Sequence, residues 1–371
     1  MNDDFMAAMR RTLGAVRDGN PAKATRIIQA ALSNTVPPEA QANARKPDHP
    51  GGPARPPWRP PSRPPSRPLS QVLADLAARR QAGGANLRGA HAPDLPEGAV
   101  FERRRHDGPH GARDYLVFRP SGRTGPARGV VMMLHGCTQT PEDFAAGTGM
   151  NRHAEDHGLI VVYPEQSRTD NLQLCWNWFR PGDQRRDGGE TALLAGLGAA
   201  VMAEHGLESA GLCVAGLSAG GAMAALLANT HPDLVTATAV HSGLAAGSAQ
   251  DVVSAFAAMR GDAAGRAEAL KVPSIIFHGS ADATVAPVNA GRLAGPLTAA
   301  VERTGRGPSR RFDVLSGLNA SGHRVEVWRI DGAGHAWSGG KVEGSYTDPA
   351  GPDASAELLR FFLAILDQKP G

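Results

Sequence analysis

Few residues in this sequence can cross-link it or anchor it in a membrane. Its 371 residues include only 3 cysteines, an odd number that is too small for a disulfide scaffold. No apolar run approaches the ~20 residues that a membrane-spanning helix requires. Hydrophobic residues still make up 41% of the chain, enough to bury a sizeable core. We therefore expect a globular protein without a membrane span, with either three free thiols or one disulfide and one free thiol.

The N-terminus lacks the pattern of a signal peptide. Asp3 and Asp4 stand where a signal peptide is basic, and Arg10 and Arg11 interrupt the place of its apolar core. The sequence therefore predicts a cytoplasmic location, with export by a non-standard route as the alternative.

Basic charge is concentrated in the first part of the chain. Residues 1–98 hold 14 Lys or Arg against 8 Asp or Glu, whereas the remainder holds 25 against 28. The formal net charge of +3 thus hides a mildly acidic main domain. We do not expect nucleic acid as a partner, because binding it would require a basic surface on that domain.

Three segments of the chain differ in composition. Residues 1–33 carry two amphipathic stretches and predict a helical hairpin. Residues 34–98 are a Pro/Arg-rich linker with a short helix, and proline at this density favours an extended polyproline II spacer. This basic linker is also suited to docking on an anionic surface or in an aromatic-lined groove. Residues 99–371 predict one large domain.

In residues 99–371, short apolar and β-branched runs alternate with helix-like stretches. Two leading strands precede continuous apolar strands, a pattern typical of a mostly parallel sheet buried on both faces by helices. The predicted fold class is therefore α/β. The expected strands are 99–105, 112–120, 129–136, 158–165, 211–216, 235–243, 272–279 and 325–332, and the expected helices are 187–205, 219–230, 251–260 and 353–368.

The strongest chemical signal is the run Gly216-Leu217-Ser218-Ala219-Gly220, which matches G-x-S-x-G. A predicted strand leads into it and a predicted helix leads out. A sharp strand-to-helix turn of this kind exposes the serine hydroxyl at the edge of the sheet, and small flanking residues avoid clashes there. We expect Ser218 to be a nucleophile rather than a structural turn serine.

A serine nucleophile needs a base, and the base needs an orienting acid. In a hydrolase sheet these follow in the order Ser, Asp, His, each in a loop after a strand. Asp282 and His335 meet both conditions and are predicted as acid and base. The alternatives are Asp251, Asp313 and Asp331 for the acid, and His241 and His278 for the base.

An acyl-transfer site also needs two donors for the tetrahedral oxyanion. One is expected from the backbone N–H of Ala219, directly after the nucleophile. The other is expected from the loop after the third strand, LHGCTQT, where Cys137 can contribute its backbone N–H. The alternative, Cys137 as a thiol nucleophile, would leave Ser218 without a task.

Metal and nucleotide motifs are missing from the sequence. There is no C-x-x-C pair, and no G-x-G-x-x-G follows the first core strand. We predict neither a metal site nor a cofactor.

Seven segments of residues 99–368 resemble, in order, the poly(3-hydroxyalkanoate) depolymerase (PHB depolymerase) family of esterases. The resemblance does not extend to the N-terminal hairpin or the linker. The segments are LHGCTQTPEDFAAGTGMN, VVYPEQ, CWNWFRPGDQRRDGGE, VAGLSAGGAMAA, VHSG, FHGSADATVAP and GAGHAWSGG with SYTDPAGPDAS.

The resemblance implies an α/β-hydrolase fold and cleavage of carboxylic esters through an acyl-serine. Carried over by motif, Ser218 is the nucleophile, Asp282 the acid and His335 the base, with Cys137 and Ala219 as oxyanion donors. It further implies that Trp176, Trp178 and Trp337 form cleft walls that bind an apolar acyl unit, with plain packing as the alternative for Trp178.

The expected substrates are short-chain hydroxyacid polyesters, their oligomers or small esters. Nothing here resembles the separate polymer-adsorbing domain of many secreted depolymerases, which favours amorphous over crystalline polymer. Feruloyl and acetylxylan esterases share much of the motif set and are the enzymatic alternative. A non-enzymatic alternative is a scaffold whose N-terminal segment contacts polymer granules or a partner.

The side chain of Cys137 remains unexplained by a backbone donor role, since any residue except proline has an N–H. A sulfur would be useful there if it joined this loop to the CWNWF loop through Cys175. Cys213, inside the strand before Ser218, would then be a buried free thiol. We state this bridge as a hypothesis, and a reducing cytoplasm would disfavour it.

Overall fold

The computed structural model describes residues 95–262 and 267–368. The predicted helical hairpin of residues 1–33 and nearly all of the linker of residues 34–98 lie outside these ranges. No helix in the described part is long and apolar enough to cross a membrane.

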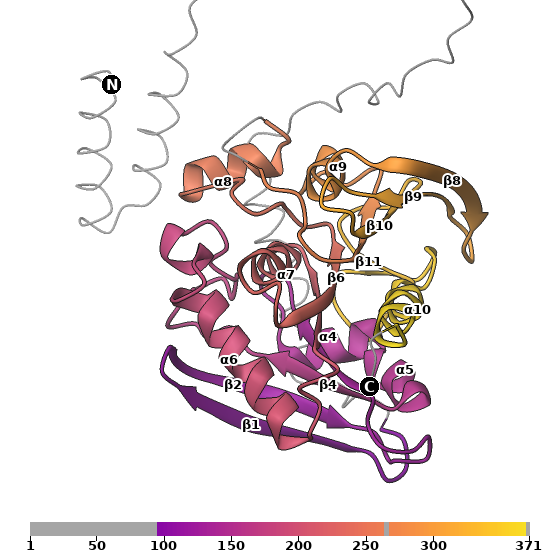
Figure 1. The fold of residues 1–371 in the computed structure, drawn as a ribbon. Coiled ribbons are helices and arrows are strands. Elements are labelled where there is room, and N and C mark those ends of the chain that lie inside the picture. Colours follow the sequence, from indigo (N-terminus) through magenta and orange to yellow (C-terminus); the bar gives the residue numbers. More distant parts are fainter. Residues whose placement is uncertain (1–94, 263–266, 369–371) are drawn as a thin grey trace, which may run out of the picture. The chain divides into compact units, whose positions relative to one another are not determined.

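A ten-stranded sheet forms the centre of the described part (Figure 1). Its strand order is β1-β2-β4-β3-β5-β6-β7-β10-β9-β8. The six strands from β4 to β10 in this order pair in parallel, and the two strands at each end pair antiparallel. The strands are β1 Val100–Gly108, β2 Gly111–Arg119, β3 Gly129–Leu134, β4 Leu159–Pro164, β5 Leu212–Leu217, β6 Val235–His241, β7 Ser274–Gly279, β8 Thr298–Arg306, β9 Arg311–Leu318 and β10 Arg324–Ile330.

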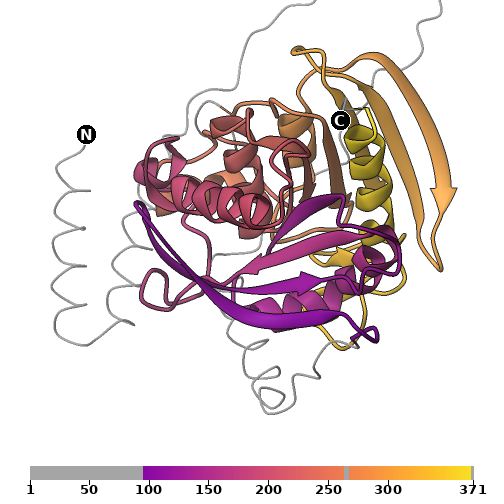
Figure 2. The ribbon, with the colours of Figure 1, turned by 60° about the horizontal axis from the view of Figure 1, so that its bottom comes forward.

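Helices cover both faces of this sheet (Figures 1 and 2). One core cluster joins the strands to α6 Gly189–Glu204, α7 Ala219–Thr230, α8 Val252–Met259 and α9 Val288–Ala294. The other joins them to α4 Pro141–Thr148, α5 Met150–His157 and α10 Ala354–Leu366. The remaining elements are a 3₁₀ turn, η1 Pro181–Gln184, and a small pair of strands, β11 Trp337–Ser338 and β12 Thr347–Asp348.

The strand β3 shows why the parallel strands read as continuous apolar runs. All six of its residues are buried. Val130, Met132 and Leu134 belong to one core cluster, while Val131 and Met133 belong to the other. Because successive side chains of a strand point to opposite faces, both faces must be apolar when helices cover both. The predicted α/β fold class is confirmed.

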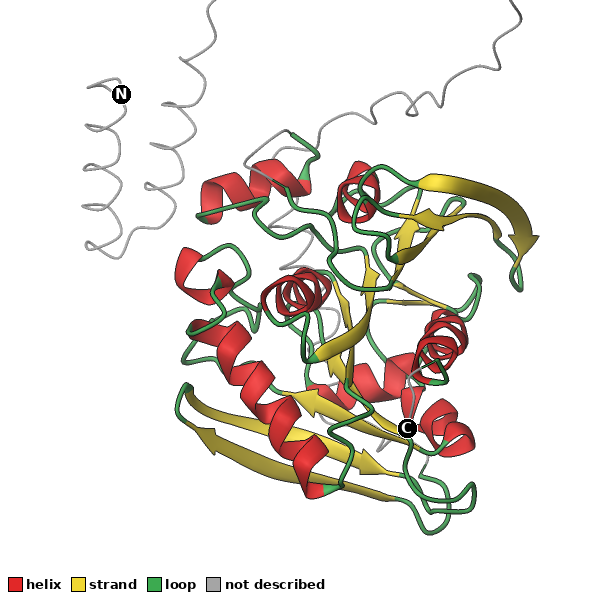
Figure 3. Cartoon of the chain, viewed as in Figure 1, coloured by secondary structure: helices red, strands yellow, loops and turns green. Residues whose placement is uncertain are grey.

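The sequence missed the antiparallel hairpin of β8 and β9 at one edge of the sheet. Every residue of β8 except one is exposed, so the strand has no buried apolar face from which the sequence could predict it. Figure 3 shows this hairpin at one edge of the sheet, opposite the edge that β1 and β2 form. The sequence also missed α4, α5 and α9, which are only seven or eight residues long.

Candidate active site

Ser218 lies in the sharp turn between β5 and α7. Its φ of 58° and ψ of −118° put it in a region that non-glycine residues rarely occupy. Such strain persists only when the surroundings determine it, and it concentrates at active sites. Its backbone N–H donates to the carbonyl oxygen of His241 at 2.9 Å, which ties the turn to the neighbouring strand β6.

The flanking glycines of this turn have no room for side chains. A Cβ atom built on Gly216 would lie 2.3 Å from the carbonyl oxygen of Gly220. One built on Gly220 would lie 2.0 Å from the carbonyl oxygen of Leu134, in β3. The glycines of G-x-S-x-G are therefore required by close backbone contact, as the sequence predicted from the motif.

Asp282 and His335 are brought together from the loops after β7 and β10. Asp282 Oδ2 lies 2.8 Å from His335 Nδ1, and Oδ1 accepts the backbone N–H groups of Thr284 and Val285 at 2.9 Å each. Burial by itself raises the pKa of the Asp282 carboxyl, but the His335 charge and these hydrogen bonds lower it far below its usual range. The carboxylate is thus ionised and held in one orientation.

The three residues predicted as a triad all follow strands of the parallel part of the sheet. Ser218 follows β5, Asp282 follows β7 and His335 follows β10, so they lie at the carboxyl edge, where α/β proteins place their sites. The hydrogen bond between His335 Nδ1 and Asp282 leaves the opposite ring nitrogen, Nε2, for a serine. Ser218 Oγ itself makes no hydrogen bond to another described residue.

His241, an alternative base, is a buried spacer between the serine turn and the loop of His335. Its ring Nε2 accepts the backbone N–H of Ser338 at 3.0 Å. The ring stacks on Phe277 and Trp337, with centroid distances of 5.7 and 5.2 Å. Burial, together with the nearby His278 and His335, lowers its pKa to about 3, so the ring is neutral.

His278 and the three rival aspartates also have partners or positions of their own. His278 Nε2 lies 2.9 Å from the carbonyl oxygen of Val285, and burial lowers the pKa of the ring. Asp251 caps α8 by accepting the N–H of Ser254, and Asp331 accepts from Ser280. Asp313 lies within β9, where it pairs with Arg329 of β10 instead of standing in a loop after a strand. Of these rivals, His278 also lies close to the predicted acid, with its Nε2 3.5 Å from Asp282 Oδ2.

Cys137 and Ala219 each have an unused backbone N–H. Ala219 is the first residue of α7, where helical N–H groups have no acceptor within the helix. Among the described residues, neither the Ala219 N–H nor the Cys137 N–H donates to the protein. The loop of Cys137 lies beside the turn of Ser218, because a Cβ built on Gly136 would be 3.7 Å from the Cβ of Ser218.

A disulfide joins Cys137 to Cys175, as hypothesised from the sequence, and Cys213 is buried outside this bond. The next residue, Thr138, has a φ of 67° and donates its N–H to the carbonyl oxygen of Gln173 at 2.7 Å. The loop with the predicted oxyanion donor is thus fastened to the loop before Trp176 by one covalent and one hydrogen bond.

The three tryptophans predicted as cleft walls are buried. Trp176 is 0% exposed, Trp337 1% and Trp178 6%. Trp176 Nε1 donates to the carbonyl oxygen of His135, and Trp337 Nε1 donates to Ser355 Oγ. The prediction is therefore corrected: Trp176 and Trp337 are core residues that support the loops on either side of the site. Trp178 is also packed in the core, which was the alternative to a cleft-wall role for this residue.

A buried polar cluster behind the disulfide was missed from the sequence. Glu190 at the start of α6 accepts from the backbone and side chain of Asn177 and from the side chain of Gln166. The side chain of Gln166 also donates to the carbonyl oxygen of Cys175 and accepts from Arg113. The sequence offered one signal for this cluster: Asn177 and Glu190 both lie in the segment CWNWFRPGDQRRDGGE, one of those that resemble the family. The resemblance implied no role for either residue.

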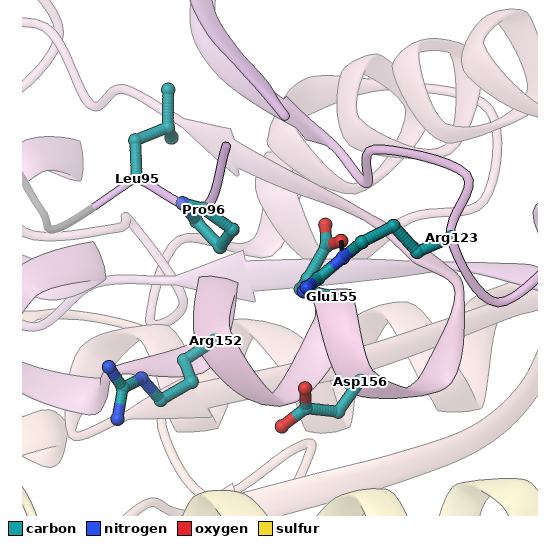
Figure 4. Close-up of a pocket in the computed structure, with 6 residues that line it drawn as sticks. All are labelled: Leu95, Pro96, Arg123, Arg152, Glu155 and Asp156. Carbon is teal, nitrogen blue, oxygen red and sulfur yellow. Dashed lines mark hydrogen bonds and ion pairs between the residues drawn. The ribbon is translucent and has the colours of Figure 1, made fainter. Parts of the chain in front are cut away.

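A surface cavity lies apart from these residues (Figure 4). Arg152, Glu155 and Asp156 of α5 line it together with Arg123, Leu95 and Pro96. Figure 4 shows the Glu155 carboxylate beside Arg123, to which it is bonded. None of the predicted site residues lines this cavity. No group of three His, Cys, Asp or Glu side chains in the described ranges is arranged to hold a metal ion.

The fold and this arrangement define the α/β-hydrolase class. Two solved structures share the fold: an acetyl xylan esterase from Aspergillus awamori and a fungal esterase from Rhizomucor miehei. The first is 20% identical, covers 64% of this chain and 94% of its own, and has a TM-score of 0.50. The second is 14% identical, covers 83% and 100%, and has a TM-score of 0.52.

The family described as Esterase PHB depolymerase matches residues 113–305, more than half of the chain. This protein belongs to that family, which confirms the resemblance seen in the sequence. A poly(3-hydroxyalkanoate) depolymerase C from Paucimonas lemoignei is 32% identical over 240 residues, 58% of this chain and 56% of its own.

A feruloyl esterase B from Neurospora crassa is 29% identical over 138 residues, covering 37% and 46% of the two chains. An acetylxylan esterase from Coprinopsis cinerea is 28% identical over 162 residues, covering 42% of each. The chain thus spans about half the length of the curated relatives it matches.

Proposed function

We propose that this protein hydrolyses carboxylic esters through an acyl-serine intermediate. Ser218 is the nucleophile, His335 the base and Asp282 the orienting acid. The observation that carries the proposal is the hydrogen-bonded pair of Asp282 and His335, at the same sheet edge as a serine in a strained strand-to-helix turn. A serine hydroxyl alone is a weak nucleophile, and an oriented imidazole is what activates it.

In the first half-reaction, Ser218 Oγ attacks the ester carbonyl carbon and its proton passes to His335 Nε2. The carbonyl oxygen becomes an oxyanion, which the N–H groups of Cys137 and Ala219 stabilise. Collapse breaks the bond to the alkoxy group, which leaves as an alcohol with the proton from His335. Asp282 keeps its negative charge throughout and stabilises the imidazolium.

In the second half-reaction, His335 removes a proton from water, and the resulting hydroxide attacks the acyl-serine. The same two N–H groups stabilise the second oxyanion. Release of the carboxylic acid restores the Ser218 hydroxyl with the proton that His335 held. No co-reactant besides water is required.

The proposed substrates are short-chain hydroxyacid polyesters or their oligomers. This choice rests on the family and on the relative named as a poly(3-hydroxyalkanoate) depolymerase, which is similar to a larger share of this chain than the other two relatives above. Feruloyl or acetylxylan esters are the second candidate, supported by the relatives with those names.

The decisive experiment compares the wild type with Ser218→Ala on a soluble p-nitrophenyl ester and on a substrate panel. The panel is amorphous polyhydroxybutyrate, polylactate, acetylated xylan and methyl ferulate. We expect clearing of polyhydroxybutyrate and no turnover by the variant beyond the residual effect of binding and the oxyanion donors. Substantial ester hydrolysis by folded Ser218→Ala would refute the mechanism, and activity confined to xylan or ferulate would replace the substrate class.

The disulfide bears on where the protein works. Disulfides persist in oxidising compartments and are rare in a reducing cytoplasm. The Cys137–Cys175 bond therefore favours the second of the two predicted locations, an extracellular one.

The contribution of the basic N-terminal segment is tested by removing residues 1–98, which should leave hydrolysis of a soluble ester largely intact and impair only contact with polymer or a partner.

A further inference from the structure

The direction of the Cys137 N–H depends on the peptide unit that it shares with Gly136. In a planar trans peptide the carbonyl and the N–H point in opposite directions, so holding one holds the other. The Gly136 carbonyl oxygen accepts the backbone N–H of Gln139 at 3.3 Å and lies 2.8 Å from His135 Nδ1. Contacts to the Gly136 carbonyl oxygen thus fix the direction of the Cys137 N–H, the proposed oxyanion donor, because both groups belong to the same peptide unit.

His135 can act only as a donor to that carbonyl. Its other nitrogen, Nε2, accepts the backbone N–H of Gln166 at 3.2 Å, so the proton must be on Nδ1. Burial lowers the pKa of His135 to about 4, which keeps the ring neutral and this tautomer in place at neutral pH.

The side chain of Gln139 holds the other end of Gly136. Its Oε1 accepts the Gly136 N–H at 2.9 Å. A Cβ built on Gly136 would lie 3.1 Å from this oxygen and 3.7 Å from the Cβ of Ser218. Gly136 therefore packs against both the Gln139 amide and the nucleophile, and a displaced amide would move the donor relative to Ser218.

The amide nitrogen of Gln139 reaches across to a distant segment. Nε2 donates to Asp143 Oδ2 at 2.9 Å and to the carbonyl oxygen of Ser345 at 3.1 Å. Asp143 Oδ1 in turn accepts the Ser345 N–H at 2.8 Å. The next residue, Tyr346, accepts the N–H of Trp337 with its carbonyl and bonds Thr138 through its hydroxyl.

Gln139 is 2% exposed, so its amide has little access to water in place of these partners. The segment it contacts continues into the loop of His335, since Trp337 is two residues after that histidine. One buried amide therefore joins the loop of the oxyanion donor to the loop of the base.

We propose that Gln139 is a positioning residue for catalysis: it orients the Gly136–Cys137 peptide toward the oxyanion and keeps that peptide in register with His335. The inference rests on the proposed function, because it requires Cys137 N–H to bind the oxyanion. Loss of Gln139 should therefore lower kcat more than it raises KM, since oxyanion donors act mainly on the transition state.

The first test replaces Gln139 with leucine and measures kcat and KM for a p-nitrophenyl ester. Removal of a whole oxyanion donor costs roughly 10²–10³-fold in kcat, so misplacing one should cost about 10–100-fold. The matched control is Gln184→Leu, which removes another amide that donates to two carbonyls, those of Trp178 and Ala249. We expect the control to keep kcat within about twofold. Wild-type kcat in folded Gln139→Leu, or an equal loss in the control, would overturn the proposal.

A second test remains informative if Gln139→Leu does not fold. Gln139→Glu keeps an oxygen for the Gly136 N–H but faces the Asp143 carboxylate, and two close carboxylates repel. Adding Asp143→Asn exchanges donor and acceptor and removes that repulsion. We expect kcat to fall in Gln139→Glu and to recover at least in part in the double variant. A double variant no more active than Gln139→Glu contradicts the proposal.

These outcomes are separable from those for the proposed function. If Ser218→Ala abolishes ester hydrolysis while the Gln139 variants keep wild-type kcat, only the positioning proposal fails. If Ser218→Ala remains active, the acyl-serine mechanism fails, and the Gln139 proposal fails with it.

Discussion

His335 Nδ1 lies 2.8 Å from Oδ2 of Asp282, which is 3% exposed and also accepts two backbone N–H groups. Sequence separation of 53 residues means that only the sheet brings the two together. The hydrogen bond selects the tautomer with a free Nε2, which is the form that can remove a proton from a serine hydroxyl.

Asp282→Asn should therefore lower kcat by about 10⁴-fold while leaving the fold intact, because an amide can stabilise the wrong imidazole tautomer. Steady-state hydrolysis of a soluble ester, with circular dichroism as the folding control, measures this. A rival acid provides the comparison: Asp313→Asn should leave kcat within about twofold. Equal losses in the two variants would show that Asp282 has no special relation to the base.

Cys137→Ala should destabilise the protein but retain most of its activity. Loss of a disulfide typically costs about 2–4 kcal/mol of unfolding free energy, whereas the backbone N–H survives the substitution. Denaturant unfolding with and without a dithiol reductant measures the effect: the reductant should destabilise the wild type to the same extent and should not affect Cys137→Ala. Cys213→Ala is the control and should keep the sensitivity to reductant. A fall of Cys137→Ala activity to the level of Ser218→Ala would show that the sulfur matters beyond the bond.

Gly220→Ala should prevent folding or destabilise the protein by more than about 4 kcal/mol. Alanine is better than glycine within a helix by about 1 kcal/mol, so such a loss must come from the clash with the Leu134 carbonyl oxygen. Gly182→Ala, where a Cβ would meet nothing within 4 Å, is the matched control and should behave like the wild type. Thermal unfolding of purified protein distinguishes them, and a wild-type melting temperature for Gly220→Ala would contradict the close approach.

Glu326→Gln should lower stability at neutral pH and weaken its dependence on acid. Burial by itself raises the pKa of Glu326, but the hydrogen bonds and charges of Arg360 and Arg324 lower it more. A carboxyl with a lowered folded pKa contributes stability above the ordinary value of about 4.3 and loses it as pH falls through the folded value.

The expected loss for Glu326→Gln at pH 7 is about 1–3 kcal/mol, below the range for fully buried pairs because both arginine side chains are 42% exposed. Melting temperatures of the wild type and the variant should converge as the pH falls from about 5 to 3. Parallel curves over that range would show that Glu326 is not a source of the acid sensitivity.

The sequence predicted the parallel strands well because β3, β4, β5 and β7 are buried on both faces and are therefore mostly apolar. It could not show the strand β8, whose exposed residues carry no such pattern. Likewise, the tryptophans of the CWNWF segment were interpreted as cleft walls from their chemistry alone. Whether an aromatic side chain faces a cleft or the core depends on the neighbours that cover it, and Trp176 is covered completely.

The sequence by itself determined the fold class, the family and the candidate residues Ser218, Asp282 and His335, because strand periodicity and a strand-to-helix motif are local properties. Only the tertiary structure decided which polar groups support them. Gln139 meets Ser345 across 206 residues, and Ser338 meets His241 across 97. Such pairings follow from the order in which strands assemble into the sheet, and no local pattern in the chain encodes that order.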